Sequence, residues 1–327
     1  MPHVLSRPRL WVERHGRGEP LLLLTGFGLS TAVFEPVLPL YTRQFEVIAF
    51  DPRGSGRSDA PLRPTSMAEL AADAASVLDA LDVEAAHVLG VSMGGMVAQE
   101  LALRFPHRVR GLVLGATWPG GPLAVRPRLT ELTALLTAIA GSARQDGRPW
   151  LAPFLFTEEF RSEHPERVAE LLEPFSRHRP SAHGVSFQFW ATVYHDTVSR
   201  LHEIQAPTLV AHGRRDAMAP LANARMLAER IPDAELAVLP GAHAFALEHP
   251  ERTQATVAEW LDRRAPIAPG RRRTDLSARV EPLTRLLGLQ IGAARTGASL
   301  VELARRRVTT TASRLPRALP RGARPRA

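Results

Sequence analysis

Three residues, Ser92, Asp216 and His243, have the types and the chain order that serine-based acyl transfer requires. A serine hydroxyl is a weak nucleophile near neutral pH, so it needs a histidine within hydrogen-bond reach as general base. The histidine in turn needs an acid that fixes its tautomer and stabilises the imidazolium. We therefore predict that these residues form a catalytic triad for the transfer of an acyl group to water without a metal.

The residues around Ser92 have the composition of a strand that turns sharply into a helix. Residues 88–91 are apolar, and Met96, Val97 and Leu101 fall on one helical face after the Gly90-Val91-Ser92-Met93-Gly94 motif. Such a turn is strained and crowds its neighbours, which explains glycine at positions 90 and 94. It would expose the Ser92 hydroxyl and aim the Met93 N–H, at a helix N-terminus, toward a developing oxyanion.

Strands and helices alternate along most of the chain, which predicts right-handed crossovers and an α/β, doubly wound, mostly parallel sheet. Asp216 and His243 each follow a predicted strand, so their loops should meet beside Ser92 at one edge of this sheet. The predicted strands are 10–13, 21–25, 45–50, 88–91, 109–114, 207–212 and 235–239. The predicted helices are 30–43, 66–81, 93–105, 220–230 and 251–263, the second opened by a capping box at Ser66 and Glu69.

Other interpretations of the two triad partners stay open at this stage. His243 could be a surface-loop histidine, and Asp216 could only shape its own loop. A rival acid after the strand 109–114 is disfavoured because residues 115–121 contain no carboxylate. We interpret the other histidines as structural, including His87, His195, His202, His212 and His249.

The second oxyanion donor should come from the loop after the strand 21–25, where glycines allow close approach, and Phe27 N–H is the candidate. At this point the chain, over roughly residues 9–263, resembles the α/β-hydrolase superfamily. The motifs at 51–58 and 90–95, with Trp190 and His195-Asp196-Thr197, are most similar to the 3-oxoadipate enol-lactonase group and its esterase and cofactor-free haloperoxidase relatives. A serine at the turn argues against the dehalogenase and epoxide-hydrolase branches, which the resemblance associates with aspartate there. The family usually has His-Gly where this chain has Thr25-Gly26, and the Thr25 hydroxyl is expected to brace the loop instead.

The domain prediction places an α/β-hydrolase core at 1–117 and 203–264, with an inserted helical cap at 118–202. The strand signal lapses in the cap, where helical patterns such as 129–140 and 165–172 alternate with prolines and aromatic residues. Such aromatics more often form the core of a cap than ligand contacts, but some must line the pocket over the nucleophile. Trp118 and Trp190 are the predicted substrate-binding residues.

Composition narrows the function classes further. The chain has 327 residues and no cysteine, which excludes disulfides, thiolate catalysis and cysteine metal sites. Neither a metal cluster nor a dinucleotide fingerprint is recognisable, so no cofactor is expected. The N-terminus lacks a signal-peptide pattern, and no apolar run approaches the ~20 residues of a membrane span, so the default prediction is a cytoplasmic location.

A basic extension, 265–327, follows the predicted core and begins with a linker rich in proline and glycine. From Arg263 onward, sixteen arginines face three acidic residues, a local charge of +13 in a chain of formal charge +8, so residues 1–262 carry −5. Apolar residues recur near helical spacing within it, and residues 316–327 have a disordered composition. It could be a flexible solubilising extension, an amphipathic segment that contacts anionic membranes peripherally, or a docking arm for nucleic acid or protein. We expect no nucleic-acid partner.

The sequence therefore predicts a carboxylic ester hydrolase with a small-molecule ester or lactone as substrate, and 3-oxoadipate enol-lactonase-like activity is one form of this. Two alternatives use the same fold. A cofactor-free haloperoxidase or perhydrolase would use the same triad, with peroxide replacing water. A non-catalytic ligand-binding relative is disfavoured because binding alone needs no base. The sequence specifies neither the particular ester nor the oligomeric state.

Overall fold

The computed structural model describes residues 3–4, 8–128, 130–131, 133, 149–178 and 180–265. Its centre is an eight-stranded sheet in the order β1-β2-β4-β3-β5-β6-β7-β8. The first two pairings, β1 with β2 and β2 with β4, are antiparallel, and the five that follow are parallel. The strands are β1 (His3–Val4), β2 (Trp11–Gly16), β3 (Glu19–Leu24), β4 (Phe45–Phe50), β5 (Ala86–Val91), β6 (Val109–Gly115), β7 (Thr208–Gly213) and β8 (Ala234–Leu239). The mostly parallel, doubly wound sheet is confirmed.

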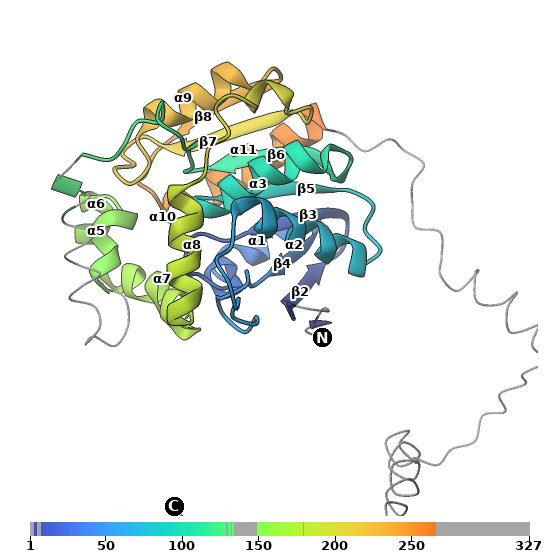
Figure 1. Cartoon of the computed structure of the whole chain (residues 1–327). Coiled ribbons are helices and arrows are strands. Elements are labelled where there is room, and N and C mark those ends of the chain that lie inside the picture. The colour runs from blue at the N-terminus through green and yellow to red at the C-terminus, as the bar shows by residue number, and fades with distance from the viewer. Residues whose placement is uncertain are drawn as a thin grey trace, which may run out of the picture. The chain divides into compact units, whose positions relative to one another are not determined.

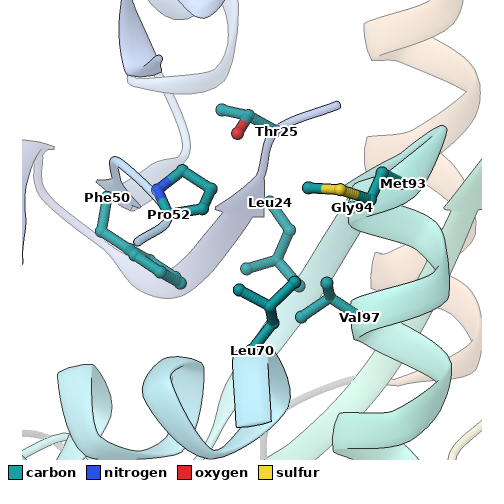
Figure 2. A pocket seen from close by; sticks show the side chains of 8 residues that line it. All are labelled: Leu24, Thr25, Phe50, Pro52, Leu70, Met93, Gly94 and Val97. Atoms are coloured by element: carbon teal, nitrogen blue, oxygen red, sulfur yellow. The ribbon is translucent and has the colours of Figure 1, made fainter. Parts of the chain in front are cut away.

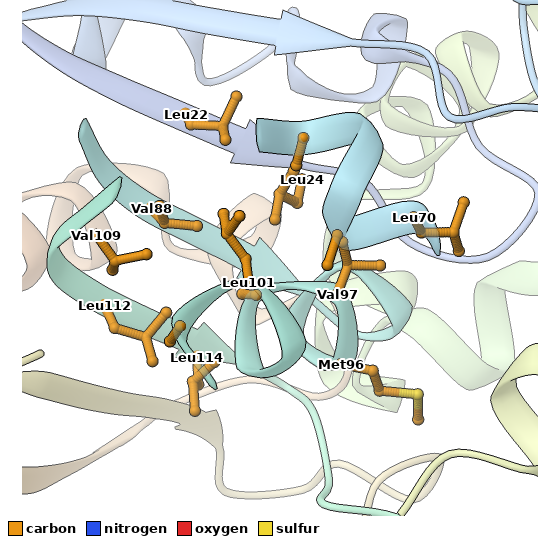
Figure 3. Packing of buried hydrophobic residues seen from close by; sticks show 14 of the residues in the cluster. Leu22, Leu24, Leu70, Val88, Met96, Val97, Leu101, Val109, Leu112 and Leu114 are labelled. Carbon is orange, nitrogen blue, oxygen red and sulfur yellow. The ribbon is translucent and has the colours of Figure 1, made fainter. Parts of the chain in front are cut away.

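Both faces of the sheet are buried at its central strands β3 to β7, which explains why these strands are mainly apolar. Alternate side chains point to opposite faces: Leu22 and Leu24 pack in one core, whereas Leu21 and Leu23 pack in the other. Figure 3 shows the first core, in which leucines and valines of β3, β5 and β6 face Met96, Val97 and Leu101 of the following helix. The core therefore holds the helix after Ser92 firmly against the sheet.

Helices flank the sheet, and further helices gather near one end of it (Figure 1). The helices of the α/β part are α1 (Leu38–Tyr41), α2 (Met67–Ala80), α3 (Met93–Arg104), α9 (Leu221–Arg230), α10 (Phe245–Glu248) and α11 (Pro250–Arg264). The predicted capping box is present, because Ser66 accepts from the Glu69 N–H and the Glu69 carboxylate accepts from the Ser66 N–H. It fixes the start of α2 where the sequence indicated.

Residues 149–203 are mainly helical in their described part. They form α5 (Ala152–Leu155), α6 (Glu158–Glu163), α7 (Pro165–Arg177) and α8 (Ala182–Val193), with 3₁₀ turns at Pro149–Leu151 and Leu201–Glu203. α7 extends five residues beyond the predicted end at 172 and includes Pro174. The expected helix at 129–140 lies almost wholly outside the described residues, and so does the extension after Ala265.

One predicted helix is wrong. Instead of a helix over 30–43, the chain forms a 3₁₀ turn at Thr31–Phe34 and the four-residue α1. Pro36 interrupts the segment, since proline lacks the N–H that a continuous helix needs. Pro39 then sits in the first turn of α1, where a missing N–H costs nothing. Within the part of the chain that the structure describes, no helix is long and apolar enough to cross a membrane.

Candidate active site

Ser92 forms the turn between β5 and α3 in a strained backbone conformation. Its φ of 57° and ψ of −121° place a non-glycine residue outside the ordinary regions, at a cost of order 1–3 kcal/mol. A Cβ on Gly90 would lie 2.2 Å from the Gly94 carbonyl oxygen, and one on Gly94 would lie 2.1 Å from the Leu24 carbonyl oxygen. The two glycines are therefore required by close backbone approach, as the sequence predicted.

The end of β6 holds this turn in place. The Ser92 N–H donates to the Gly115 carbonyl at 2.9 Å, and the Thr117 hydroxyl donates to the Ser92 carbonyl at 2.7 Å. The Ser92 hydroxyl, which is only partly buried, donates to none of the described residues. The strained backbone is thus anchored while the side-chain oxygen stays available.

Asp216 and His243 are in direct contact. The His243 Nδ1 lies 2.9 Å from the Asp216 Oδ2, and the Asp216 side chain is fully buried. The other carboxylate oxygen, Oδ1, accepts from the N–H groups of Met218 and Ala219 at 2.9 and 2.8 Å. A carboxylate only accepts, so Nδ1 carries the proton and the Nε2 of neutral His243 has a free lone pair.

His212 is a further part of this cluster that the sequence analysis left as structural. Its Nε2 lies 2.7 Å from the Ala219 carbonyl and 3.4 Å from the Asp216 Oδ2, so Nε2 is protonated. Burial lowers the pKa of His212, although the Asp216 charge opposes that shift. The side chain is therefore neutral, and its one Nε2–H donates to the Ala219 carbonyl, which holds the loop that carries Asp216. Its position near the end of β7, four residues before Asp216, is the signal that could have found it.

The sheet brings the three candidate residues to one edge. β5, β6, β7 and β8 are consecutive parallel strands, and Ser92, Asp216 and His243 follow the carboxyl ends of the first, third and fourth. A Cβ on Gly213 would lie 2.1 Å from the Ala242 carbonyl, so the loops carrying Asp216 and His243 touch directly. This is the arrangement that the chain order predicted, and the catalytic roles themselves remain predictions.

The loop after β3 lies against the Ser92 turn. A Cβ on Gly26 would be 3.6 Å from the Ser92 Cβ, and the Phe27 N–H donates to no described residue. Met93 is the first residue of α3, so its N–H has no acceptor within the helix. Both predicted oxyanion donors therefore have a free N–H beside the turn. The expected Thr25 brace is a long contact, 3.4 Å from its hydroxyl to the Leu29 carbonyl.

The packing beneath this loop leaves only a small void. A cavity of about 10 Å³ lies between the end of β3 and the start of α3, lined by Leu24, Thr25, Phe50, Pro52, Leu70, Met93, Gly94 and Val97 (Figure 2). This is close to the smallest space that holds one water, and the side chains around it are mainly apolar. The apolar packing supports the loop and the first turn of α3 together.

The motif at 51–58 braces the loop after β3, a role that the sequence resemblance did not specify. The buried Asp51 carboxylate accepts from the Thr31 N–H at 2.7 Å and from the Arg57 N–H at 2.8 Å. The Gly28 N–H is held from the other side by the Gln188 amide oxygen of α8 at 2.9 Å. The Gln188 amide nitrogen donates to the Arg53 carbonyl at 2.9 Å. The β3 loop, the 51–58 motif and α8 thus form one hydrogen-bonded unit.

The two predicted substrate-binding tryptophans lie in different surroundings. The Trp118 carbonyl accepts from Gln99 at 3.1 Å, and its half-buried ring packs against the core that contains α3. Trp190 is half-exposed on α8 and stacks on Tyr194 with ring centroids 5.7 Å apart. Their contacts with substrate stay a prediction. Among the described residues, no three His, Asp or Glu side chains are grouped to hold a metal ion.

Comparison with known proteins agrees with this architecture. The sequence profile described as alpha/beta hydrolase fold matches residues 19–250. The chain is 34% identical, over 74% of its length and 91% of the relative's, to RutD of Azorhizobium caulinodans, which is named for carbamate hydrolysis. It is 33% identical to a poly(3-hydroxyalkanoate) depolymerase of Ectopseudomonas oleovorans, over 74% of this chain and 84% of that one.

A solved structure supports the same relationship. The thermophilic esterase of Thermogutta terrifontis superposes with a TM-score of 0.68 at 27% sequence identity. The match covers 81% of this chain and 98% of the esterase, so it extends over nearly the whole of that protein.

Proposed function

Because the chain belongs to the alpha/beta hydrolase fold family, and is a hydrolase of that fold, we propose that it hydrolyses a carboxylic ester or lactone through Ser92, His243 and Asp216. The observation that carries this proposal is the 2.9 Å contact between His243 Nδ1 and the buried Asp216 Oδ2. This contact fixes the tautomer that leaves Nε2 as the base for the Ser92 hydroxyl.

The proposed reaction has two steps. In the first, the Ser92 hydroxyl attacks the carbonyl carbon while His243 Nε2 takes its proton, and the Phe27 and Met93 N–H groups donate to the oxyanion. The intermediate then collapses, and the imidazolium returns the proton to the departing alkoxide. In the second step a water, deprotonated by His243, attacks the acyl-enzyme and releases the acid. Asp216 stabilises the imidazolium in both steps.

Two of the named relatives support ester chemistry, namely the depolymerase, named for a polyester, and the thermophilic esterase. The 34% identity to RutD favours carbamate as a second candidate substrate. A carbamate also has a carbonyl carbon that a serine can attack, so both substrate classes would use the same residues.

The central experiment compares Ser92→Ala with wild type on p-nitrophenyl butyrate. Removing a triad nucleophile should lower kcat by about 10⁴-fold to 10⁶-fold. Ser162→Ala is the matched control. Ser162 is an exposed serine of α6, and its hydroxyl donates only to the Glu159 carbonyl of the same helix. Hydrolysis by Ser92→Ala at a rate close to that of Ser162→Ala would refute the assignment.

A substrate panel then separates the two candidate classes. We expect kcat/KM for enol-lactones, methyl esters, short aryl esters or 3-hydroxyalkanoate oligomers to exceed that for carbamate. If kcat/KM is instead higher for carbamate, and Ser92→Ala abolishes that activity, carbamate hydrolysis replaces ester hydrolysis as the proposed function.

A further inference from the structure

A second pocket lies away from the Ser92 turn, between the start of α2, the later turns of α3 and one face of α8. Its volume is about 610 Å³, within the range of about 300–1,000 Å³ that is usual for small-molecule sites. Glu100 of its wall is eight residues from Ser92 along α3, which corresponds to about 12 Å. None of Ser92, Asp216 and His243 is among its lining residues, which are Pro64, Thr65, Ser66, Met67, Ala68, Glu100, Arg104, Ser186, Phe187, Trp190, Ala191, Tyr194, His195, Asp196 and Arg200.

One wall of this pocket is apolar and aromatic. Phe187, Trp190 and Tyr194 recur at helical spacing on α8, so they share one face. Trp190 and Tyr194 stack with an interplanar angle of 23°, yet they remain 48% and 78% exposed. Rings that pack on each other and still face a hollow offer a flat surface for a planar apolar ligand.

Other lining residues carry polar groups whose bonding capacity is not used up. Arg104, whose side chain is 47% exposed, donates through Nε to the Glu100 carboxylate at 2.7 Å, while its two terminal nitrogens donate to no described residue. Glu100 is already paired with both Arg104 and Arg200, so it does not compete for those free donors. A guanidinium edge with free N–H groups matches a carboxylate better than any neutral acceptor.

Two buried side chains beside these groups also have no partner. Both ring nitrogens of His195, which is 3% exposed, lack a hydrogen bond, and so does the Thr65 hydroxyl. A bound molecule can supply the partner that a buried polar atom lacks. Burial lowers the pKa of His195 to about 4, so it is a neutral donor and acceptor near pH 7.

We propose that this pocket is a second binding site, separate from the Ser92 turn, for a small aromatic carboxylate. The ring packs against Trp190 and its neighbours, and the carboxylate binds the free edge of Arg104. Binding at this site does not require the triad, so it can be tested independently of the proposed hydrolysis.

The test measures binding of 2-naphthoate and of its neutral analogue 2-naphthamide to the full chain by isothermal titration calorimetry. The Ser92→Ala protein is the background, so turnover cannot interfere. We expect saturable one-to-one binding of naphthoate. Arg104→Gln should weaken it at least about tenfold, the loss expected for one charge-assisted contact, and should leave naphthamide binding unchanged. Trp190→Ala should weaken both ligands.

Arg167→Gln, on the exposed surface of α7, is the matched control for Arg104→Gln and should change neither affinity. Circular dichroism of each variant checks that the fold is kept. If Arg104→Gln fails to fold, Arg104→Lys takes its place, because it keeps the charge and loses the planar edge, and should still weaken naphthoate selectively. The proposal is overturned if binding is not saturable or if all variants bind with equal affinity. It is also overturned if naphthoate inhibits ester hydrolysis by the protein with Ser92 intact competitively, and Arg104→Gln does not change that inhibition.

Discussion

Two buried carboxylates, Asp216 and Glu100, are held in opposite ways. The Asp216 side chain, which is 0% exposed, is bound by two backbone N–H groups and by His243, and His212 lies 3.4 Å away. The Glu100 side chain, which is 6% exposed, is paired with two arginines. Burial raises the pKa of Glu100, but hydrogen bonds from Arg200 and Arg104 outweigh it, and the net pKa is lowered.

The difference separates a carboxylate that can assist a reaction from one that fastens the fold. Asp216 has hydrogen bonds but no permanent counter-charge, so its charge is available to stabilise a proton arriving on His243. The charge of Glu100 is already neutralised by two arginines, and although Glu100 raises the pKa of the nearby His195, burial outweighs this effect and lowers it. A buried acid near a histidine is therefore not sufficient evidence of a triad. The partners of the acid determine whether its charge can stabilise a protonated histidine.

The largest effect should come from Asp216→Asn. The amide cannot stabilise the imidazolium and favours the wrong His243 tautomer, so kcat should fall by about 10⁴-fold while the fold is kept. Turnover of p-nitrophenyl butyrate and a urea unfolding curve measure the two quantities. A kcat within tenfold of wild type would remove Asp216 from the proposed mechanism.

Glu100→Gln should have the reverse effect, with lower stability and nearly unchanged kcat. Leaving two partly exposed arginines without their buried partner should cost about 1–3 kcal/mol of unfolding free energy, with kcat changed by less than about tenfold. Because the pKa of Glu100 is lowered by folding, its contribution is present above the ordinary glutamate pKa of about 4.3 and is lost as the pH falls below it. The stability difference from wild type, measured in urea at pH 7 and at low pH, should therefore shrink in acid. A kcat loss as large as that of Asp216→Asn would contradict the comparison.

His212→Leu should have an intermediate effect on catalysis. It removes the hydrogen bond to the Ala219 carbonyl but keeps the two backbone N–H groups and His243 on Asp216, so we expect kcat to fall about tenfold with KM unchanged. Steady-state kinetics at several pH values test this, because a positioning role should also move the pH at which activity is half-maximal. An unchanged kcat and pH profile would make His212 a purely structural residue.

The smallest effect should come from an exposed carboxylate. Glu170 pairs with Arg167 at 2.9 Å on the surface of α7, where both side chains are about half-exposed or more. Such pairs contribute about 0–1 kcal/mol, so Glu170→Gln should leave both kcat and the urea midpoint nearly unchanged. A large loss of stability here would show that charge alone, and not burial, explains the Glu100 result.

The sequence predicted the structure best where a backbone or burial requirement permits only a few residue types. The strained turn at Ser92 admits only glycine at two neighbours, and buried parallel strands must be apolar runs, so both were predictable. The contacts that depend on distant segments were not. Gln188 reaches the Gly28 N–H across 160 positions, and Asp51 reaches Thr31 through a loop whose shape no local pattern determines. The helix expected at 30–43 does not form for a local reason, since Pro36 has no N–H to donate within it.

The contact between α8 and the 51–58 motif also decides how this protein can be redesigned. A Cβ on Gly184 would lie 2.2 Å from the Gly54 carbonyl, and one on Gly54 would lie 2.5 Å from the Gly184 Cα. Any side chain at either position would push α8 off the 51–58 motif and so disturb the hydrogen bond from the Gly28 N–H to Gln188. Mutant libraries that aim to alter selectivity should therefore keep both glycines fixed and place their diversity at the exposed α8 positions 189, 190 and 193.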